Sequence, residues 1–250
     1  MLRSFSDRMM TPRSRPPRGL FITLEGTEGC GKSTQAKLLG EHLRNQGYDT
    51  VETREPGGTP LAEKIRSLLL DRADEPVAPE TEAFLVLAAR RQHVVQVIEP
   101  ALARGSIVLC DRFIDSTLAY QGYARGLDIA TLERFNRLAT HTLMPDLTLV
   151  FDLPVSTGLA RRRSAAELNR LDRESLRFHR SVRTGFLDLA KRHPTRIKVL
   201  SARASKEAVA RAVARVVTPM LGHIGRGVDH NRPAASRPSP QKSQARHAIR

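Results

Sequence analysis

The chain has 250 residues, of which 40% are hydrophobic and 27% are charged, a composition typical of a soluble protein with one sizeable core. It contains no apolar run near the roughly 20 residues that a membrane-spanning helix needs. The two cysteines, Cys30 and Cys110, lie far apart in the sequence. They lack the spacing of a metal site and indicate a reducing, cytoplasmic location.

The net charge of +15 is concentrated at the two ends of the chain. Residues 1–19 carry a charge of +4 and residues 222–250 a charge of +5. Both ends are rich in arginine, serine and proline without apolar periodicity, which predicts disordered basic extensions at 1–18 and 222–250. The charge alone does not predict a nucleic-acid partner, because a protein that handles anionic nucleotides also tolerates a basic core.

Between the extensions, residues 19–221 alternate between short apolar runs and segments of helical periodicity. In chain order we expect a strand at 20–25, a helix at 32–46, a strand at 50–54, helices at 61–70 and 78–103, a strand at 106–110, a helix at 128–141, a strand at 147–152, helices at 157–163 and 173–191, a strand at 196–200 and a helix at 205–220. Strands that are apolar on both faces and alternate with helices predict a three-layer α/β fold with a parallel sheet of about five strands. Ligands of such sheets bind beyond the carboxyl ends of the strands.

A glycine-rich loop follows the first predicted strand and precedes the first helix. Residues 26–33 read GTEGCGKS, which fits the P-loop pattern G-x-x-x-x-G-K-[ST], whose backbone N–H groups cradle phosphates. In such a loop Lys32 bridges the β- and γ-phosphates, and the hydroxyl of Ser33 ligates Mg²⁺. The expected ATP-binding residues are Gly26, Thr27, Glu28, Gly29, Cys30, Gly31, Lys32, Ser33 and Thr34. The loop predicts binding of a nucleoside triphosphate but does not identify the phosphate acceptor.

Charged side chains end two further strands. Arg54 ends the strand at 50–54 and precedes a Pro-Gly-Gly turn, while Asp111 and Arg112 follow the strand at 106–110. An aspartate in this position can hold Mg²⁺ through water, and an adjacent arginine can bind a phosphate as a two-pronged donor. A solvated Arg54 and a structural ion pair at Asp111–Arg112 are the alternatives. Glu25, at the end of the first strand, is expected to be structural.

Five segments together resemble bacterial thymidylate kinases, which are P-loop nucleoside-monophosphate kinases. The segments read LEGTEGCGKST at 24–34, TREPGGT at 53–59, AARRQ at 88–92, DRF at 111–113 with AYQG at 119–122, and PDLTL at 145–149. They agree with the family in order and spacing over residues 20 to about 215. The resemblance implies transfer of a phosphoryl group from ATP to dTMP, with Mg²⁺, no covalent enzyme intermediate, and a homodimer.

The resemblance also implies an acceptor site for dTMP. Its expected members are Glu28, Arg54, Arg90, Arg112, Ser116, Tyr120 and Gln121. By resemblance Arg54 and Arg112 hold the dTMP phosphate, Arg90 contacts thymine, and Glu28 accepts a hydrogen bond from the 3′-hydroxyl group. Tyr120 would exclude a ribose 2′-hydroxyl group by its bulk, although an ordinary core aromatic is the alternative interpretation.

A run of arginines at 161–163, followed by a polar stretch, resembles the mobile lid of these kinases, here placed at about 161–172. Family members with no basic residue at the variable positions of the P-loop supply a catalytic arginine from this lid. Arg161, Arg163 and Arg170 are candidates, and a solvated helix face is the alternative. The expected catalytic residues are Lys32, Asp111, Arg112, Arg161 and Arg163, with Ser33 and Asp111 as metal ligands.

Two departures from the family pattern keep other functions open. Val86 stands four residues before Arg90, where the family usually has a phenylalanine that stacks on thymine. In the lid, Ala165 replaces an arginine and Asn169 replaces an aspartate. A kinase for another deoxynucleoside monophosphate, and a nucleotide-sensing or nucleic-acid-binding protein on the same scaffold, are therefore the alternatives.

Overall fold

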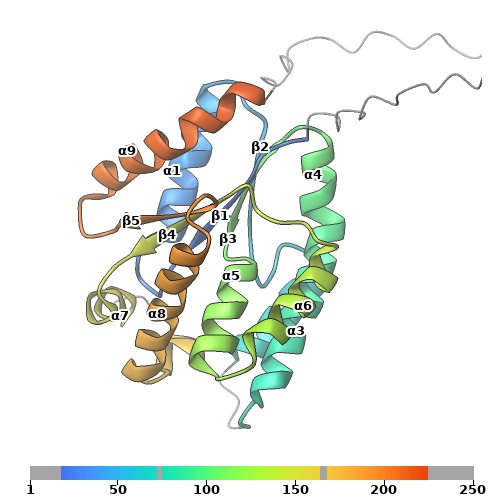
Figure 1. Ribbon diagram of the computed structural model, residues 1–250, viewed down its shortest axis with the longest axis vertical. Coiled ribbons are helices and arrows are strands. Elements are labelled where there is room, and N and C mark those ends of the chain that lie inside the picture. Colours follow the sequence, from blue (N-terminus) through green and yellow to red (C-terminus); the bar gives the residue numbers. More distant parts are fainter. Residues whose placement is uncertain (1–17, 72–74, 164–167, 225–250) are drawn as a thin grey trace, which may run out of the picture.

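Figure 1 shows the computed structural model, which describes residues 18–71, 75–163 and 168–224. Five parallel strands form one sheet in the order β2-β3-β1-β4-β5. The strands are β1 (Phe21–Glu25), β2 (Thr50–Arg54), β3 (Ile107–Asp111), β4 (Leu147–Asp152) and β5 (Ile197–Ser201). This five-stranded parallel sheet with helices on both faces confirms the predicted α/β fold.

The helices follow the predicted order, and polar side chains cap several of them. They are α1 (Lys32–Asn45), α2 (Pro60–Leu70), α3 (Pro79–His93), α4 (Glu99–Ala103), α5 (Ile114–Thr117), α6 (Ile129–Thr140), α7 (Val155–Arg163), α8 (Leu176–Arg192) and α9 (Lys206–Val217). Short π-helical segments lie at η1 (Val94–Ile98) and η2 (Leu118–Ala124), and 3₁₀ segments at η3 (Leu171–Arg173) and η4 (Thr218–His223). Thr59, Asp128, Ser175 and Ser205 each accept a hydrogen bond from a backbone N–H group in the first turn of the following helix.

The sheet separates two apolar layers. In Figure 1, α1 and α9 cover one face, and α4, α5 and α8 lie on the other. Because side chains alternate along a strand, Ile22 and Leu24 of β1 pack into the layer with α1 and α9, whereas Phe21 packs against α4 and η1. Among the described residues, no helix is both long enough and apolar enough to cross a membrane.

The structure corrects three details of the predicted elements. The edge strands β2 and β5 are partly exposed, with Val199 44% exposed, so they are not apolar on both faces. The helix expected at 78–103 changes to π-helical spacing at η1. The helical segment at 114–124 was missed because the buried polar residues Asp115, Ser116 and Gln121 interrupt its apolar periodicity.

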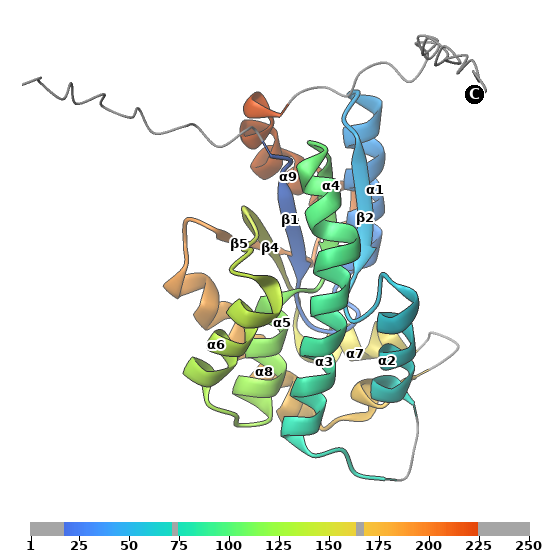
Figure 2. The ribbon, with the colours of Figure 1, turned by 90° about the vertical axis from the view of Figure 1, so that its right-hand side faces the viewer.

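The carboxyl ends of the strands bring the predicted site residues to one end of the sheet. Arg54 lies opposite Asp111 in the register of β2 and β3, and Leu24 of β1 lies opposite Asp111 on the other side. Figure 2 shows α2 and α7 at this end of the molecule. Apart from Arg18 and residues 222–224, the predicted extensions lie outside the described residues, as does the lid segment 164–167 with Ala165.

Candidate active site

A cleft of about 240 Å³ opens at the carboxyl ends of the strands. The predicted residues that line it are Glu28, Lys32, Ser33, Arg54, Arg90, Asp111, Arg112, Ser116, Tyr120 and Gln121. Val86, Asn169 and Leu171 line it as well. Arg161 and Arg163 lie at the end of α7, where both are exposed, and they are not among the described residues that line the cleft.

The P-loop adopts a backbone that requires glycine. Gly29 has a φ of 69° and Gly31 a φ of 95°, both in the left-handed region. A Cβ atom on Gly29 would lie 2.0 Å from the carbonyl oxygen of Gly158, so the loop touches the backbone of α7 directly. The ammonium group of Lys32 is buried in the loop and donates to the carbonyl oxygens of Gly26 and Thr27, at 3.1 and 3.0 Å.

Ser33 and Asp111 meet at the mouth of the loop. The Ser33 hydroxyl donates to Oδ2 of Asp111 at 2.6 Å. The described residues contain no group of three or more His, Cys, Asp and Glu side chains that could hold a metal by themselves. Mg²⁺ beside a nucleotide usually takes one or two protein oxygens together with phosphates and water. The pair Ser33 and Asp111 is therefore a fitting donor set for Mg²⁺.

Arg112 connects the P-loop to the acceptor half of the cleft. It has a φ of 72°, and its Nη1 donates to the carbonyl oxygen of Gly26 at 3.1 Å and to Ser116 Oγ at 3.3 Å. Its Nη2 donates to Glu28 Oε1 at 3.1 Å, and the guanidinium lies 4.9 Å from the centre of the Tyr120 ring. Burial alone would lower the pKa of Arg112, but Tyr120 and Glu28 outweigh it and raise that pKa. The side chain is thus a fixed cation.

Glu28 is held by three donors from three segments. Besides Arg112, the Tyr120 hydroxyl donates to its Oε1 at 2.5 Å, and Nδ1 of His179 donates to its Oε2 at 3.1 Å. Burial raises the pKa of Glu28, but the His179 hydrogen bond and the charges of Arg112 and Lys32 outweigh it. The pKa therefore lies well below its usual range. His179 was not found from the sequence, because its position on α8 carries no local motif.

Arg90 is anchored more firmly than a ligand-binding arginine on a helix surface would be. Its side chain is 1% exposed, and Nε donates to Glu55 Oε2 at 2.7 Å. Nη1 donates to Thr117 and Asn136, and Nη2 donates to the carbonyl oxygen of Phe113. A guanidinium has five N–H groups, so these four bonds leave one N–H group for the cleft. Arg90 is a core residue with one edge in the site.

Arg54 and Arg66 give the cleft further positive charge. Nη2 of Arg54 donates to both carboxylate oxygens of Glu63, at 3.1 and 3.0 Å. Arg66 of α2 donates to the carbonyl oxygen of Pro56 and lines the cleft beside Arg54. Burial, and then repulsion by Arg54, lowers the pKa of Arg66. Arg66 was not predicted from the sequence, although its position on the helix after the Pro-Gly-Gly turn could have indicated it.

Glu25 supports the turn that carries Arg112. Its carboxylate is fully buried and accepts hydrogen bonds from the backbone N–H of Phe113 at 2.7 Å and from Ser116 Oγ at 2.6 Å. Burial, followed by the charge of Asp115, raises the pKa of Glu25 to about 7. The contacts fit the structural role expected for this residue.

The described part of the expected lid is tied down by two of its arginines. Arg162 donates to both carboxylate oxygens of Asp172 at 3.0 Å, and Nη2 of Arg170 donates to Glu82 Oε2 at 2.6 Å. Asn169 caps the same turn, since its side chain accepts from the backbone N–H of Asp172. Arg170 is therefore tied to α3 through Glu82, a residue that was not predicted from the sequence.

Comparison with known proteins places this geometry in one family. The sequence profile described as thymidylate kinase matches residues 24–213. The thymidylate kinase of Ectopseudomonas mendocina is 56% identical, covering 74% of this chain and 88% of that protein, and the enzyme of Thermomicrobium roseum is 55% identical, covering 80% and 95%. The crystal structure of thymidylate kinase from Ehrlichia chaffeensis superposes with a TM-score of 0.67 at 36% identity, covering 81% of this chain and 99% of that one.

Proposed function

The chain belongs to the thymidylate kinase family, and from this premise we propose that its cleft transfers the γ-phosphoryl group of ATP to dTMP. The family resemblance inferred from the motifs is thereby confirmed, and the protein is a nucleoside-monophosphate kinase. One observation carries the assignment of the chemistry. Arg112 contacts Gly26 and Glu28 of the P-loop and also Ser116 on the acceptor side, so donor and acceptor halves share one cation.

The reaction needs positioning and charge neutralisation rather than a covalent enzyme intermediate. A phosphate oxygen of dTMP attacks the γ-phosphorus of ATP. The bond between that phosphorus and the β,γ-bridging oxygen breaks, and ADP and dTDP are formed. Arg54 and Arg112 hold the acceptor phosphate, and Lys32 neutralises charge on the donor phosphates. Arg112 is held by Gly26, Ser116 and Glu28 before the reaction, so this cation stabilises the transition state without reorganisation.

Magnesium binding is part of the proposal. Ser33 and Asp111 are the residues that would hold Mg²⁺, because their oxygens lie 2.6 Å apart beside the P-loop. When bound, the ion neutralises phosphate charge and orients the donor phosphates. Within the protein, Asp111 also stands next to Arg112, so the carboxylate lies where the donor and acceptor groups meet.

The acceptor half of the cleft fits a deoxyribonucleotide. The remaining N–H group of Arg90 can donate to a carbonyl oxygen of the base, and Glu28 can accept from the 3′-hydroxyl group. Tyr120 is fixed by its hydrogen bond to Glu28 and stacks against Arg112, so its ring cannot move aside for a 2′-hydroxyl group. Val86 lines the cleft in place of the usual aromatic residue, which supports a kinase for another deoxynucleoside monophosphate as the second candidate.

Closure of the lid supplies the remaining cations in this proposal. Arg161 and Arg163 extend from α7, whose Gly158 packs directly on Gly29 of the P-loop. The proposed role requires the end of α7 to move toward the donor phosphates. An arginine delivered in this way is worth about 10³–10⁵ in rate in related phosphotransferases.

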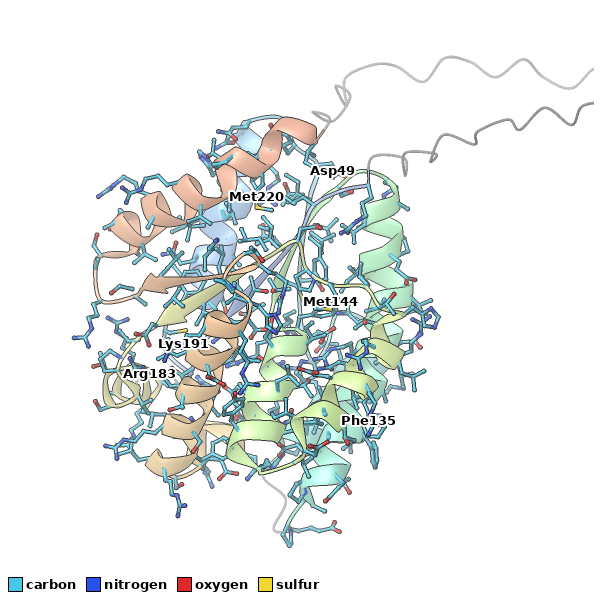
Figure 3. The ribbon with its side chains drawn as sticks, in the orientation of Figure 1. Asp49, Phe135, Met144, Arg183, Lys191 and Met220 are labelled. Carbon is cyan, nitrogen blue, oxygen red and sulfur yellow. The ribbon has the colours of Figure 1, made fainter. Side chains whose placement is uncertain are left out.

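We also propose a homodimer and a cytoplasmic location. Phe84 on α3 is 57% exposed and Phe135 on α6 is 36% exposed, with ring centres 6.0 Å apart, and Leu138 beside them is 74% exposed. Figure 3 shows Phe135 at the outer surface of the molecule. Contiguous exposed apolar side chains favour an interface, and a fall to the monomer mass in Leu138→Asp, measured by light scattering, is expected. The two free, buried cysteines support a reducing compartment.

The experiment that tests the function is an assay of ADP release with ATP, Mg²⁺ and a panel of dTMP, dUMP, UMP, dCMP, dGMP and AMP. Turnover is expected to be greatest with dTMP. Arg112→Lys is expected to lower kcat by about 10²–10³, because a lysine cannot reach Gly26, Ser116 and Glu28 together. Greatest turnover with another acceptor would support the second candidate, and ATP binding without turnover would support a nucleotide-binding protein.

A further inference from the structure

One buried carboxylate next to the cleft-lining residue Gln121 accepts hydrogen bonds from three side chains. Glu82, in the first turn of α3, is 1% exposed. Its Oε1 accepts from Nε2 of Gln121 at 2.8 Å and from Nε of Arg125 at 3.3 Å. Its Oε2 accepts from Nη2 of Arg125 at 3.1 Å and from Nη2 of Arg170 at 2.6 Å. Gln121 lies in η2, Arg125 directly follows η2, and Arg170 lies at the described end of the lid.

The contact with Glu82 fixes which end of the Gln121 amide faces the cleft. Burial raises the pKa of Glu82, but hydrogen bonds from Arg125, Gln121 and Arg170 outweigh it and lower that pKa, so the group is a carboxylate. A carboxylate only accepts hydrogen bonds, which forces the NH₂ group of Gln121 toward Glu82. The carbonyl oxygen Oε1 has no hydrogen-bond partner in the described part of the chain, and Gln121 lines the cleft. Gln121 therefore presents a hydrogen-bond acceptor, its carbonyl oxygen, to the cleft.

The same carboxylate anchors the lid. Nε of Arg170 donates to the carbonyl oxygen of Leu69, and its backbone N–H donates to that of Leu70, so Arg170 is bound to both α2 and α3. Its two neighbours, Asn169 and Leu171, line the cleft. Arg125 extends the cluster, since it also donates to Glu174 and lies 4.5 Å from the ring centre of Phe178.

We propose that Glu82 is a positioning residue that sets the choice of acceptor base, by holding the Gln121 carbonyl toward the base and Arg170 at the edge of the cleft. This inference rests on the proposed function. Arg90 offers one N–H donor and Gln121 one carbonyl acceptor, a pair that matches the O4 acceptor and N3–H donor of thymine and uracil. Cytosine presents the opposite pair on the same edge, a donor at N4 and an acceptor at N3.

The test is the ratio of kcat/KM for dTMP to kcat/KM for dCMP in Glu82→Gln. A glutamine at this position can donate to Gln121, which allows the Gln121 amide to turn and present its NH₂ group to the base. The ratio is expected to fall about tenfold. The ratio of dTMP to dUMP is expected to stay unchanged, since these bases share the O4 and N3–H edge. Glu80→Gln changes an exposed residue two positions before Glu82 on α3; it is the matched control and is expected to change neither ratio.

The outcomes separate the inference from the proposed function. Equal losses for dTMP and dCMP would overturn the inference, because they would show a merely structural role. A wild-type protein without dTMP turnover would instead overturn the proposed function. If Glu82→Gln does not fold, Glu82→Asp replaces it. Aspartate keeps the negative charge beside Arg125 and Arg170, but its shorter side chain no longer reaches Gln121. An unchanged ratio of kcat/KM for dTMP to that for dCMP in this variant also contradicts the proposal.

Discussion

The floor of the cleft and its lid differ in how their charged groups are held. On the floor, Arg90 is 1% exposed and Glu28 10% exposed at the side chain, and each has several hydrogen-bond partners from other segments. At the lid, Arg161 and Arg163 are exposed on the last turn of α7. The buried floor groups are therefore in place before ligands bind, whereas the role proposed for Arg161 and Arg163 requires these exposed side chains to move toward the donor phosphates.

This difference predicts two kinds of mutational effect. Buried floor residues satisfy one another, so removing one leaves a partner unpaired and costs stability. Exposed lid residues contribute little to stability, and their removal changes the rate alone. Measuring both stability and rate in each variant tests whether the two effects are separate.

The largest effect is expected at the lid, in the double variant Arg161→Ala/Arg163→Ala. If lid arginines neutralise the transferred phosphoryl group, kcat falls by about 10³ or more. The free energy of unfolding is expected to stay within about 1 kcal/mol of wild type, because both side chains are exposed. Steady-state kinetics and urea unfolding measure the two quantities.

The matched control for the lid is Arg211→Ala/Arg215→Ala. These arginines are exposed on α9, and their loss changes the net charge by the same amount. The control is expected to leave kcat within about twofold, since it lies away from the cleft. A similar fall in both double variants would show that total charge, rather than the lid, supports the reaction.

The second effect is a loss of stability in Arg90→Met. Methionine leaves the carboxylate of Glu55 buried with His93 as its one remaining side-chain partner among the described residues, and breaking a buried pair in this way costs about 3–5 kcal/mol. The neighbouring Arg91, which donates a long hydrogen bond to the carbonyl oxygen of Ala139 at 3.5 Å, provides the control Arg91→Met, with an expected loss under about 1 kcal/mol. Equal losses in urea unfolding would contradict the distinction between floor and surface.

The sequence predicted the parts of the site that are contiguous. The P-loop, Arg54 and Asp111–Arg112 each follow a strand, so local pattern was enough to place them at one end of a parallel sheet. The burial of Arg90 and the roles of Glu82 and His179 were not predictable in this way. Glu82 meets Gln121 and Arg170 across 39 and 88 positions, and no local pattern reports a contact of that separation.

The third prediction concerns Glu25, whose pKa is raised to about 7 from 4.5. The folded protein binds this proton more tightly than the unfolded chain, so wild-type stability falls as pH rises between those values. Glu25→Gln lacks this proton. The free energy of unfolding of the variant, relative to that of wild type, is therefore expected to rise by about 2 kcal/mol from pH 5 to pH 8. Urea unfolding at both pH values measures it, and a constant difference would show that Glu25 ionises normally in the folded protein.

The smallest effect is expected at His179, which donates a hydrogen bond to Glu28. Its side chain is fully buried, Nδ1 donates to Glu28, and Nε2 has no partner in the described part of the protein. His179→Leu removes the donor, so Glu28 can turn away from the acceptor. We expect kcat/KM for dTMP to fall about tenfold.

Comparison of two substrates and two variants distinguishes this effect from general destabilisation. If Glu28 accepts from the 3′-hydroxyl group, His179→Leu should affect 3′-deoxythymidine monophosphate by less than about threefold, because that substrate lacks the hydroxyl. His179→Asn keeps an N–H donor near the position of Nδ1 and is expected to retain most of the activity with dTMP. Equal falls in kcat/KM with both substrates would show that His179 acts by packing alone. The hydrogen bond from His179 would then not be what orients Glu28 toward the acceptor.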